Sequence, residues 1–375
     1  MRPTTIVLDG RILAYRRGGI ARYVECLARS IAECRDIDGD ALECKLLTNR
    51  PLPSSPLPTI RCLTPPHHRF EVWTLAIELA RRRPSLFHAT DFVLPVLPRS
   101  VRGIVTIHDL AFLDAPHELA PEAYHYYVRT LSRARKADRV IADSRATAAK
   151  IVERCPELMD RVRVVHLGVD RRWFAFPPGA DEILTERLGD LATRPLVLAV
   201  GTVEPRKRYD LLLDTFRLLR EELGGEPFLV VVGQRGWRAE ATAARLRREE
   251  AKGTLRWLED ADDAVLQALY SRSSLLVVAS RDEGFCLPAL EALAAGLPVV
   301  AFAVGALPEV LGDAALLVTE ETPEALATAC VQVLRDAHLR QQLSARGRVR
   351  AQQFSWEKTA RETLRVYREV LQDGF

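Results

Sequence analysis

The sequence predicts two α/β domains, each a doubly wound parallel sheet of the Rossmann-like type. The chain has 375 residues, more than one ordinary core holds, because domains usually contain about 100–200 residues. Short apolar runs alternate with longer amphipathic patterns along the whole chain, and a stretch with prolines and a glycine divides them into two series. Strands that alternate with helices indicate parallel sheets with helices on both faces, so two series indicate two domains.

The first series of apolar runs predicts strands over Thr5–Leu8, Leu42–Leu47, Leu86–His88, Ile104–His108, Val140–Ala142 and Val162–Val165. The helical spacing of apolar residues between these runs predicts helices over Ile20–Glu33, Phe70–Arg82, Glu122–Lys136 and Arg145–Arg154.

The second series predicts strands over Leu196–Val200, Phe228–Val232, Thr254–Leu258, Leu275–Ala279, Val299–Phe302 and Ala315–Val318. The linker is expected within Asp170–Arg194, where Trp173–Gly179 contains two prolines and a glycine. The domains are therefore assigned to residues 1–175 and 190–354. A last helix is predicted over Ser355–Leu371.

The composition, with 48% hydrophobic and 27% charged residues, is typical of a soluble globular protein. A net charge of +3 is too small to indicate a nucleic-acid partner. The seven cysteines are odd in number and include no C-x-x-C pair, so a reducing cytosol fits better than a disulfide framework or a zinc site. The apolar part of the N-terminal segment is too short for a signal peptide. Glycines and prolines interrupt the uncharged segment Ala292–Pro308, which is predicted as helix end, turn and buried strand rather than a membrane span.

The strongest local signal lies between Ala279 and Val300. This segment follows a buried strand and opens a helix, and Pro288 suits the helix start because its missing N–H would have no partner there. The backbone N–H groups at the helix start form an anion site suited to a diphosphate, at Gly284, Phe285, Cys286 and Leu287. Glu283 and Glu291 offer carboxylates to sugar hydroxyls. For Glu291, a first-turn carboxylate that complements the helix dipole is the alternative interpretation.

A basic segment follows the predicted strand that ends at Gly201. Pro205 suits a helix start, which places Arg206 and Lys207 in the first helical turn. Cations are unfavourable there, because the N-terminus of a helix is already positive. An anion bound between the two side chains would remove this conflict, and an ordinary exposed basic face is the alternative.

Two features of the first domain are candidates for a site. Gly18 and Gly19 precede a helix and allow close approach to the backbone, or they form an ordinary turn. They are not part of a G-x-G-x-x-G motif, so no dinucleotide site is indicated. His108 ends a strand, where ligand sites of such sheets lie, although a structural histidine fits the same position.

No metal site is expected. Asp260 and Asp262 form a D-x-D tripeptide, but Asp262 is expected to cap the helix that follows. The histidines show no metal-ligand spacing.

Together, these segments resemble family 4 retaining glycosyltransferases of the GT-B type. The resemblance covers nearly the whole chain, and its most specific part is the E-x7-E pattern from Glu283 to Glu291 in EGFCLPALEALAAGLPVV. Further matching segments are GGIARY, TIHDL, ADS at 142–144, HLGVD at 166–170, GTVEPRKRYDLLLDTF, GALPEVLGDAALLV and FSWEKTA.

The resemblance implies two Rossmann-like domains that face a cleft. The C-terminal domain would hold the nucleotide-sugar donor and the N-terminal domain the acceptor, with the last helix, residues 355–375, packing back on the N-terminal domain. By position, Glu291 resembles the carboxylate that binds the donor ribose, and Glu283 the one near the transferred sugar. The amides from Gly284 to Leu287 would hold the sugar and the diphosphate.

The remaining implied roles concern the diphosphate and the sugar. Arg206 and Lys207 resemble the cations that steady the leaving diphosphate, beside Gly201. His108 resembles the histidine near the donor sugar, and Gly18 and Gly19 match the loop that approaches the donor phosphates. Two departures stand out. Cys286 replaces a common glycine, which is expected to narrow the sugar pocket. The segment Trp257–Asp260 lacks another common glycine, so no nucleobase contact is assigned.

The resemblance implies retaining transfer of a hexose with no metal or other cofactor. The GIARY and EPRK groups favour mannose from GDP-mannose and assembly of a bacterial polysaccharide such as lipopolysaccharide, while UDP-glucose and UDP-N-acetylglucosamine stay open as donors. The expected acceptor is a glycan or a lipid-linked acceptor, and the expected location is the cytoplasm, with peripheral contact at the inner membrane. The alternatives are a sugar-nucleotide epimerase of the same layout and a non-catalytic subunit of an assembly complex. A third is a peripheral membrane module that uses Arg81–Arg83 and a basic helix over Arg129–Arg139.

Overall fold

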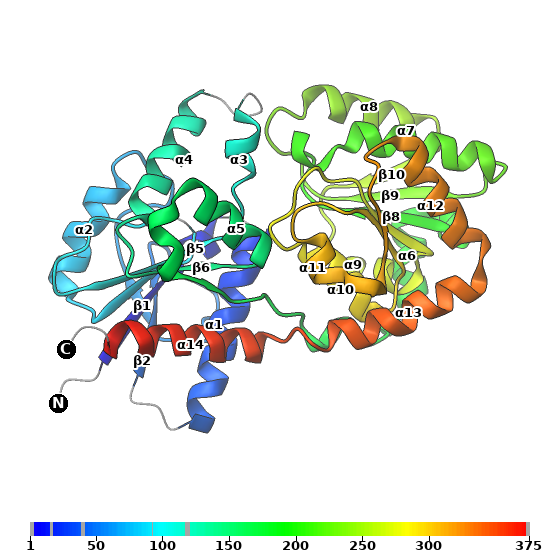
Figure 1. Ribbon diagram of the computed structural model, residues 1–375. Coiled ribbons are helices and arrows are strands. Elements are labelled where there is room, and N and C mark those ends of the chain that lie inside the picture. The colour runs from blue at the N-terminus through cyan, green and yellow to red at the C-terminus, as the bar shows by residue number, and fades with distance from the viewer. Residues whose placement is uncertain (1–3, 16–17, 39–41, 92, 117–120, 373–375) are drawn as a thin grey trace. The chain divides into compact units, whose positions relative to one another are not determined.

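The computed structural model describes residues 4–15, 18–38, 42–91, 93–116 and 121–372. The chain forms two compact units, each a parallel sheet with helices on both faces (Figure 1). Unit 1 comprises Met1–Gly168 and Phe354–Phe375, and unit 2 comprises Val169–Gln353. The predicted fold class, two Rossmann-like α/β sheets, is confirmed.

The sheet of unit 1 has the strand order β3-β2-β1-β4-β5-β6-β7, with every pair parallel. Its strands are β1 (Thr4–Asp9), β2 (Leu42–Thr48), β3 (Thr59–Arg61), β4 (Leu86–Ala89), β5 (Arg102–Ile107), β6 (Arg139–Ala142) and β7 (Val162–Val164). The main helices are α1 (Gly19–Asp38), α2 (Glu71–Arg82), α3 (Ala111–Asp114), α4 (Pro121–Ala134), α5 (Arg145–Arg154) and α14 (Trp356–Gln372). The strand order reverses between β1 and β4, so the carboxyl ends of these two strands flank the topological switch point of the unit.

The C-terminal helix α14 packs against α1 and crosses it, as Figure 1 shows. Glu369 on α14 pairs with Arg139 and Arg163 at the starts of β6 and β7. The Thr359 hydroxyl donates to the His166 carbonyl at 2.7 Å. Gly168 leaves room for this crossing, because a Cβ there would lie 2.1 Å from the Trp356 nitrogen.

A buried row of polar groups ties α14 to the sheet. Tyr23 OH, on α1, lies 3.0 Å from Thr106 Oγ1, which lies 2.8 Å from His88 Nε2. His88 Nδ1 lies 2.7 Å from Tyr367 OH, on α14. Burial, followed by the nearby charge of His108, lowers the pKa of His88 to about 3, so this imidazole is neutral and one of its nitrogens accepts while the other donates.

The sheet of unit 2 has the order β10-β9-β8-β11-β12-β13, again fully parallel. Its strands are β8 (Leu196–Val200), β9 (Phe228–Val232), β10 (Leu255–Leu258), β11 (Leu275–Val278), β12 (Val299–Phe302) and β13 (Leu316–Val318). The helices are α6 (Ala180–Leu188), α7 (Tyr209–Glu222), α8 (Glu240–Ala251), α9 (Asp263–Arg272), α10 (Leu287–Ala295), α11 (Leu307–Leu311), α12 (Pro323–Arg335) and α13 (Ala337–Ala351). The order reverses between β8 and β11, which places a second switch point at their carboxyl ends.

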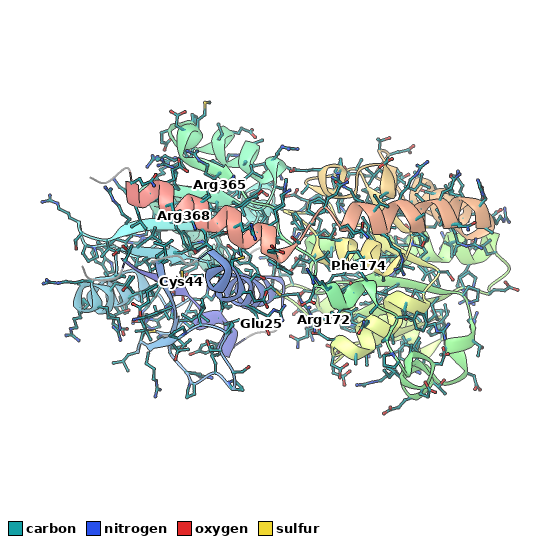
Figure 2. The ribbon with its side chains drawn as sticks, turned by 90° about the horizontal axis from the view of Figure 1, so that it is seen from below. Glu25, Cys44, Arg172, Phe174, Arg365 and Arg368 are labelled. Atoms are coloured by element: carbon teal, nitrogen blue, oxygen red, sulfur yellow. The ribbon has the colours of Figure 1, made fainter. Side chains whose placement is uncertain are left out.

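The expected linker over Trp173–Gly179 is wrong, because this stretch belongs to unit 2. Trp173 is 1% exposed and packs edge-on against Tyr270 at 5.4 Å, and the Phe174 carbonyl accepts from Arg348. Arg172 and Phe174 mark this short helical turn in Figure 2. The prolines therefore begin unit 2 and do not separate it from unit 1. Within the described residues, no helix is long and apolar enough to cross a membrane.

Candidate active site

Two loops that follow neighbouring strands meet at the switch point of unit 2. The loop after β8 carries Arg206 and Lys207, and the loop after β11 carries Glu283. Lys207 Nζ donates to Glu283 Oε1 at 2.5 Å, and an Arg206 Nη atom donates to Glu283 Oε2 at 3.1 Å. Three predicted site residues, from two segments far apart in the sequence, are thereby joined in one cluster at the edge of the sheet where ligands of doubly wound folds bind.

Arg206 and Lys207 do not lie in the first turn of a long helix, as the sequence predicted. They belong to a separate 3-10 turn, Pro205–Lys207, because Arg208 adopts the left-handed conformation at φ 50° and α7 begins only at Tyr209. Carboxylates neutralise both cations: Glu283 contacts both side chains, and Glu204 Oε1 lies 2.9 Å from Arg206. An anion is therefore not needed to relieve a conflict with the helix dipole.

The carboxylate of Glu283 is held ionised. The side chain is 5% exposed, and burial alone would raise its pKa. The charges of Lys207 and Arg206 and hydrogen bonds from Lys207 and Ser280 outweigh burial and lower the pKa to about 2. Ser280 contributes its hydroxyl to Glu283 Oε1 at 2.6 Å. Glu283 thus accepts from three side chains and fixes the two cations at the switch point.

The sequence predicted a helix that begins at Pro288, and α10 begins one residue earlier, at Leu287. Pro288 lies at its second position, and Gly284, Phe285 and Leu287 are buried around the helix start. Cys286 caps the helix at φ 75°, in the left-handed region that favours glycine. This φ gives a backbone reason for the glycine that the resemblance leads one to expect at this position, independent of pocket size.

Gly305 holds the Glu283 loop from the other side and was not predicted as a site residue. It lies at φ 53°, and a Cβ there would lie 2.5 Å from the Glu283 carbonyl oxygen and 2.7 Å from its nitrogen. The Ala306 nitrogen donates to the Glu283 carbonyl at 2.8 Å. The signal in the sequence was a glycine in GALPEV after a buried strand, which marks close approach of two backbones.

Glu291 lies on the fifth residue of α10 and is 4% exposed. The Tyr270 hydroxyl, on α9, donates to Glu291 Oε2 at 3.1 Å. The alternative, a first-turn carboxylate that complements the helix dipole, does not fit, because α10 has no acidic residue in its first turn. Tyr270 is a further partner that periodicity alone could not separate from a core aromatic.

Gly201 ends β8 next to Lys207. Its φ is 150°, and a Cβ there would contact the stem and ammonium of Lys207 at 3.4 to 3.7 Å. The Gly201 carbonyl accepts from Tyr209 OH at 2.6 Å. Gly233, at the end of β9, is required because a Cβ would lie 2.0 Å from the Gly201 oxygen. Gly201 is therefore favoured by its backbone conformation, and Gly233 by the close approach of the Gly201 carbonyl.

His108 follows β5 in unit 1 and is 13% exposed. Its Nδ1 lies 2.7 Å from Asp143 Oδ2, and its Nε2 lies 2.9 Å from the Thr90 carbonyl. The ring of Tyr23 packs edge-to-face on the imidazole at 4.9 Å. Asp143, in the segment ADS, was not predicted to contact His108.

Gly18 and Gly19 stand at the start of α1 and are exposed. A Cβ at either position would have no atom of the described residues within 4 Å. The packing of these residues therefore does not explain the two glycines. The neighbouring Arg16 and Arg17 of the same segment lie outside the described residues.

The D-x-D tripeptide has a structural explanation. Asp262 caps α9 by accepting from the Val265 nitrogen at 2.9 Å, as predicted. Asp260 is 76% exposed and pairs with Arg187 at 3.4 Å. Among the described residues, no three His, Cys, Asp or Glu side chains are grouped closely enough to hold a metal ion.

The two doubly wound sheets, with charged and glycine-rich loops at the carboxyl ends of their strands, define a protein of the GT-B class. Residues 17–173 match the family model described as Glycosyltransferase Family 4, and residues 182–350 match Glycosyl transferases group 1. O-antigen chain mannosyltransferase B of Escherichia coli is 30% identical over 303 residues, which cover 80% of this chain and 78% of that protein. The chain belongs to glycosyltransferase family 4 and is a retaining hexosyltransferase that uses a nucleotide-sugar donor.

Two further proteins show how the similarity is distributed. D-inositol 3-phosphate glycosyltransferase of Kineococcus radiotolerans is 35% identical over 254 residues, covering 63% of this chain but only 58% of that protein. The structure of sucrose-phosphate synthase from Thermosynechococcus elongatus has a TM-score of 0.76 at 22% identity, covering 99% of this chain and all of that one. The similarity to sucrose-phosphate synthase concerns the fold alone.

Proposed function

We propose that this glycosyltransferase moves mannose from GDP-mannose to a glycan or lipid-linked acceptor in the assembly of a bacterial polysaccharide. One observation carries the catalytic part of the proposal: Arg206 and Lys207 converge on Glu283 at the switch point of unit 2. Fixed cations at such a position stabilise the negative charge that grows on a leaving diphosphate. The O-antigen mannosyltransferase supports the choice of sugar and pathway.

Each site residue takes a role in this proposal. In unit 2, Glu283 accepts hydrogen bonds from hydroxyls of the transferred sugar. The amides from Gly284 to Leu287 hold the diphosphate, and Glu291 binds the donor ribose. Unit 1 receives the acceptor, while His108 acts near the donor sugar and Gly18 and Gly19 admit the donor phosphates. The exposed, unhindered position of the two glycines supports their role.

A ligand screen tests the choice of donor. A ligand that binds only the folded state stabilises it by about 2.7 kcal/mol at a hundredfold excess over Kd. We expect GDP-mannose and GDP to raise Tm more than UDP- or dTDP-sugars do. A larger shift with UDP-glucose would overturn the mannose assignment. An epimerase would convert the donor without an acceptor, whereas a transferase releases GDP in step with glycosylation of the acceptor.

The Glu291→Gln variant is expected to keep the fold and to bind the donor about 10- to 100-fold more weakly, because hydrogen bonds to a charged group contribute about 1.5–3 kcal/mol. Glutamine retains an acceptor for Tyr270 OH, so the buried contact survives. Titration of donor into the folded variant measures the effect, and Tyr270→Phe is the matched control for losing the protein contact alone. Unchanged affinity in Glu291→Gln would exclude the ribose role.

Contact with the membrane is proposed through α2 of unit 1. Phe70, Trp73 and Ile77 are 49%, 61% and 56% exposed and follow one another at helical spacing. The two glutamates of α2 are engaged away from this apolar face. Glu71 is buried, and Glu78 accepts hydrogen bonds from the backbone nitrogens of Leu63 and Thr64.

Exposed arginines flank this apolar face of α2 in the sequence, with Arg69 before it and Arg81 and Arg83 after it. Exposed apolar side chains flanked by arginines fit the surface of an anionic bilayer. The other predicted basic segment, Arg129–Arg139, is not one helix, because α4 ends at Ala134 and Arg139 begins β6. Arg135 and Arg139 in that segment already pair with Glu157 and Glu369.

The Trp73→Ser/Ile77→Ser double variant is expected to bind vesicles with anionic lipid at least tenfold more weakly, because each large apolar side chain removed from water contributes about 1.5–3 kcal/mol. Co-sedimentation with vesicles measures the binding. Trp237→Ser, which removes a 47% exposed tryptophan from unit 2, is the control. Equal binding of the double variant and the wild type would exclude α2 as the contact.

A further inference from the structure

The contacts of His108 determine its protonation state. Its Nε2 lies 2.9 Å from the carbonyl oxygen of Thr90, and its Nδ1 lies 2.7 Å from a carboxylate oxygen of Asp143. A carbonyl oxygen only accepts hydrogen bonds, and so does an ionised carboxylate. Both ring nitrogens must then carry a proton, which makes the ring an imidazolium.

The surroundings favour this charged form. Burial alone would lower the pKa of His108, but the charge of Asp143, its hydrogen bond, the charge of Asp91 and the hydrogen bond to Thr90 together raise it to about 9. Asp143 is 2% exposed, and its Oδ1 has no hydrogen-bond partner among the described residues. The positive charge of His108 is thus the main compensation for burying this carboxylate.

The other groups packed around the ring do not change this state at neutral pH. The hydroxyl of Tyr23 points to Thr106, and burial raises the pKa of Tyr23 far above its ordinary value. His88, on the neighbouring strand, stays neutral because its pKa is lowered to about 3. Neither group competes for the protons of His108.

We propose that His108 acts as a permanent imidazolium, locked by Asp143 and the Thr90 carbonyl, which serves sugar transfer by its positive charge and not by giving or taking a proton. The catalytic half of this proposal rests on the proposed function of the site. Both ring nitrogens carry a proton that is donated to a protein acceptor, so neither nitrogen can act as a base. A fixed cation of this kind stabilises developing negative charge without reorganising during the reaction. Asp143 is the positioning residue.

Nuclear magnetic resonance tests the protonation state without requiring turnover. In protein labelled with 15N-histidine, we expect both ring nitrogens of His108 to show cationic shifts from pH 6 to 8, assigned by comparison with His108→Gln. In Asp143→Asn, the titration midpoint should fall to 6.5 or below. A wild-type His108 that is neutral at pH 7.5 would overturn the proposal.

The pH dependence of kcat/KM tests the role of the charge. In the wild type, kcat/KM should not fall through deprotonation of His108 between pH 6 and 8, because His108 stays protonated until the pH exceeds its raised pKa. In Asp143→Asn the charged fraction falls as pH rises through the lowered pKa. At pH 8, a pKa of 6.5 leaves about one ring in thirty charged, so activity should be about 30-fold below wild type and recover toward pH 6.

Asp138→Asn is the matched control, since Asp138 stands at the opposite end of β6, where it accepts from Arg102 and the Gly103 nitrogen. Its pH profile should follow the wild type. An Asp143→Asn variant whose His108 is neutral at pH 8 but whose activity does not depend on pH would overturn the role of the charge. If the proposed function itself is wrong, the wild-type protein will transfer no sugar, and this result is distinct from either outcome for His108.

Discussion

Replacing Lys207 by alanine is expected to lower kcat about 100-fold while acceptor binding changes little, by comparison with the removal of one fixed oxyanion donor. The ammonium lies 2.5 Å from Glu283 and is 14% exposed, so it is held in place before the donor arrives. An ammonium has three donors, which lets it contact a diphosphate oxygen while it keeps Glu283. A cation fixed in this way favours the transition state, in which the diphosphate gains charge, over the bound donor.

Steady-state kinetics with saturating donor measure this loss. Lys252→Ala is the matched control, because it removes a lysine of the same unit that is 63% exposed and pairs with Glu249. A loss of turnover in Arg206→Ala would be harder to interpret, because Arg206 also donates to the Asp282 carbonyl and joins the two loops. If folded Lys207→Ala protein turned over at the wild-type rate, the leaving-group role would have to be abandoned.

The Glu283→Ala variant is expected to lower the free energy of unfolding by about 3 kcal/mol. It is also expected to reduce the rate of sugar transfer more than Lys207→Ala does. Removing one partner of a buried ion pair leaves the other charge uncompensated, which costs about 3–5 kcal/mol. The low end applies here, because Arg206 and Lys207 keep 17% and 14% of their surface exposed. The hydroxyl of Ser280 loses its acceptor in the same change.

Urea unfolding measures the stability of this variant, and Glu259→Ala is its control. Glu259 pairs with Arg247 but is 38% exposed, so its loss should change the free energy of unfolding by less than about 0.5 kcal/mol. Acid adds a second measure. The pKa of Glu283 lies at about 2, below its unfolded value, so its contribution is present above pH 4.5 and is lost as the pH falls toward 2. Glu283→Gln should lack this dependence. A Glu283→Ala protein as stable as the wild type would show that the ion cluster contributes nothing to the fold.

The fold could be predicted because buried parallel strands are continuous apolar runs. Phe228–Val232 and Leu196–Val200 are strands with the bounds that the sequence predicted. β3 was missed because Thr59–Arg61 is short, polar and mostly exposed at the sheet edge. α6 was missed because two prolines and a glycine suggested a linker, whereas the buried Trp173 ties the start of that stretch to unit 2.

The sequence identified candidate site residues but not the contacts between them. Glu283, the cations and His108 were predicted from their places after strands, and Glu291 from its place in the helix that follows Glu283. Their partners lie far away in the sequence, as with Lys207 and Glu283 or His108 and Asp143, and no local pattern encodes such contacts. The turn at Pro205–Lys207 also depends on the left-handed Arg208, a conformation that an arginine does not signal in sequence.

The hydrogen-bonded row that ends at Tyr367 sets the order in which the protein matures during synthesis. His88 and Thr106 are fully buried, and Tyr367 follows all of unit 2 in the sequence, so it leaves the ribosome after unit 2. Until then, unit 1 lacks both the cover of α14 and the Tyr367 hydroxyl that pairs with His88 Nδ1, so the surface that α14 buries stays open to water. Unit 2 is contiguous in sequence and can fold as soon as it emerges. The half of the enzyme that is made first is therefore completed last, and a fragment that stops at Gly168 is an incomplete domain.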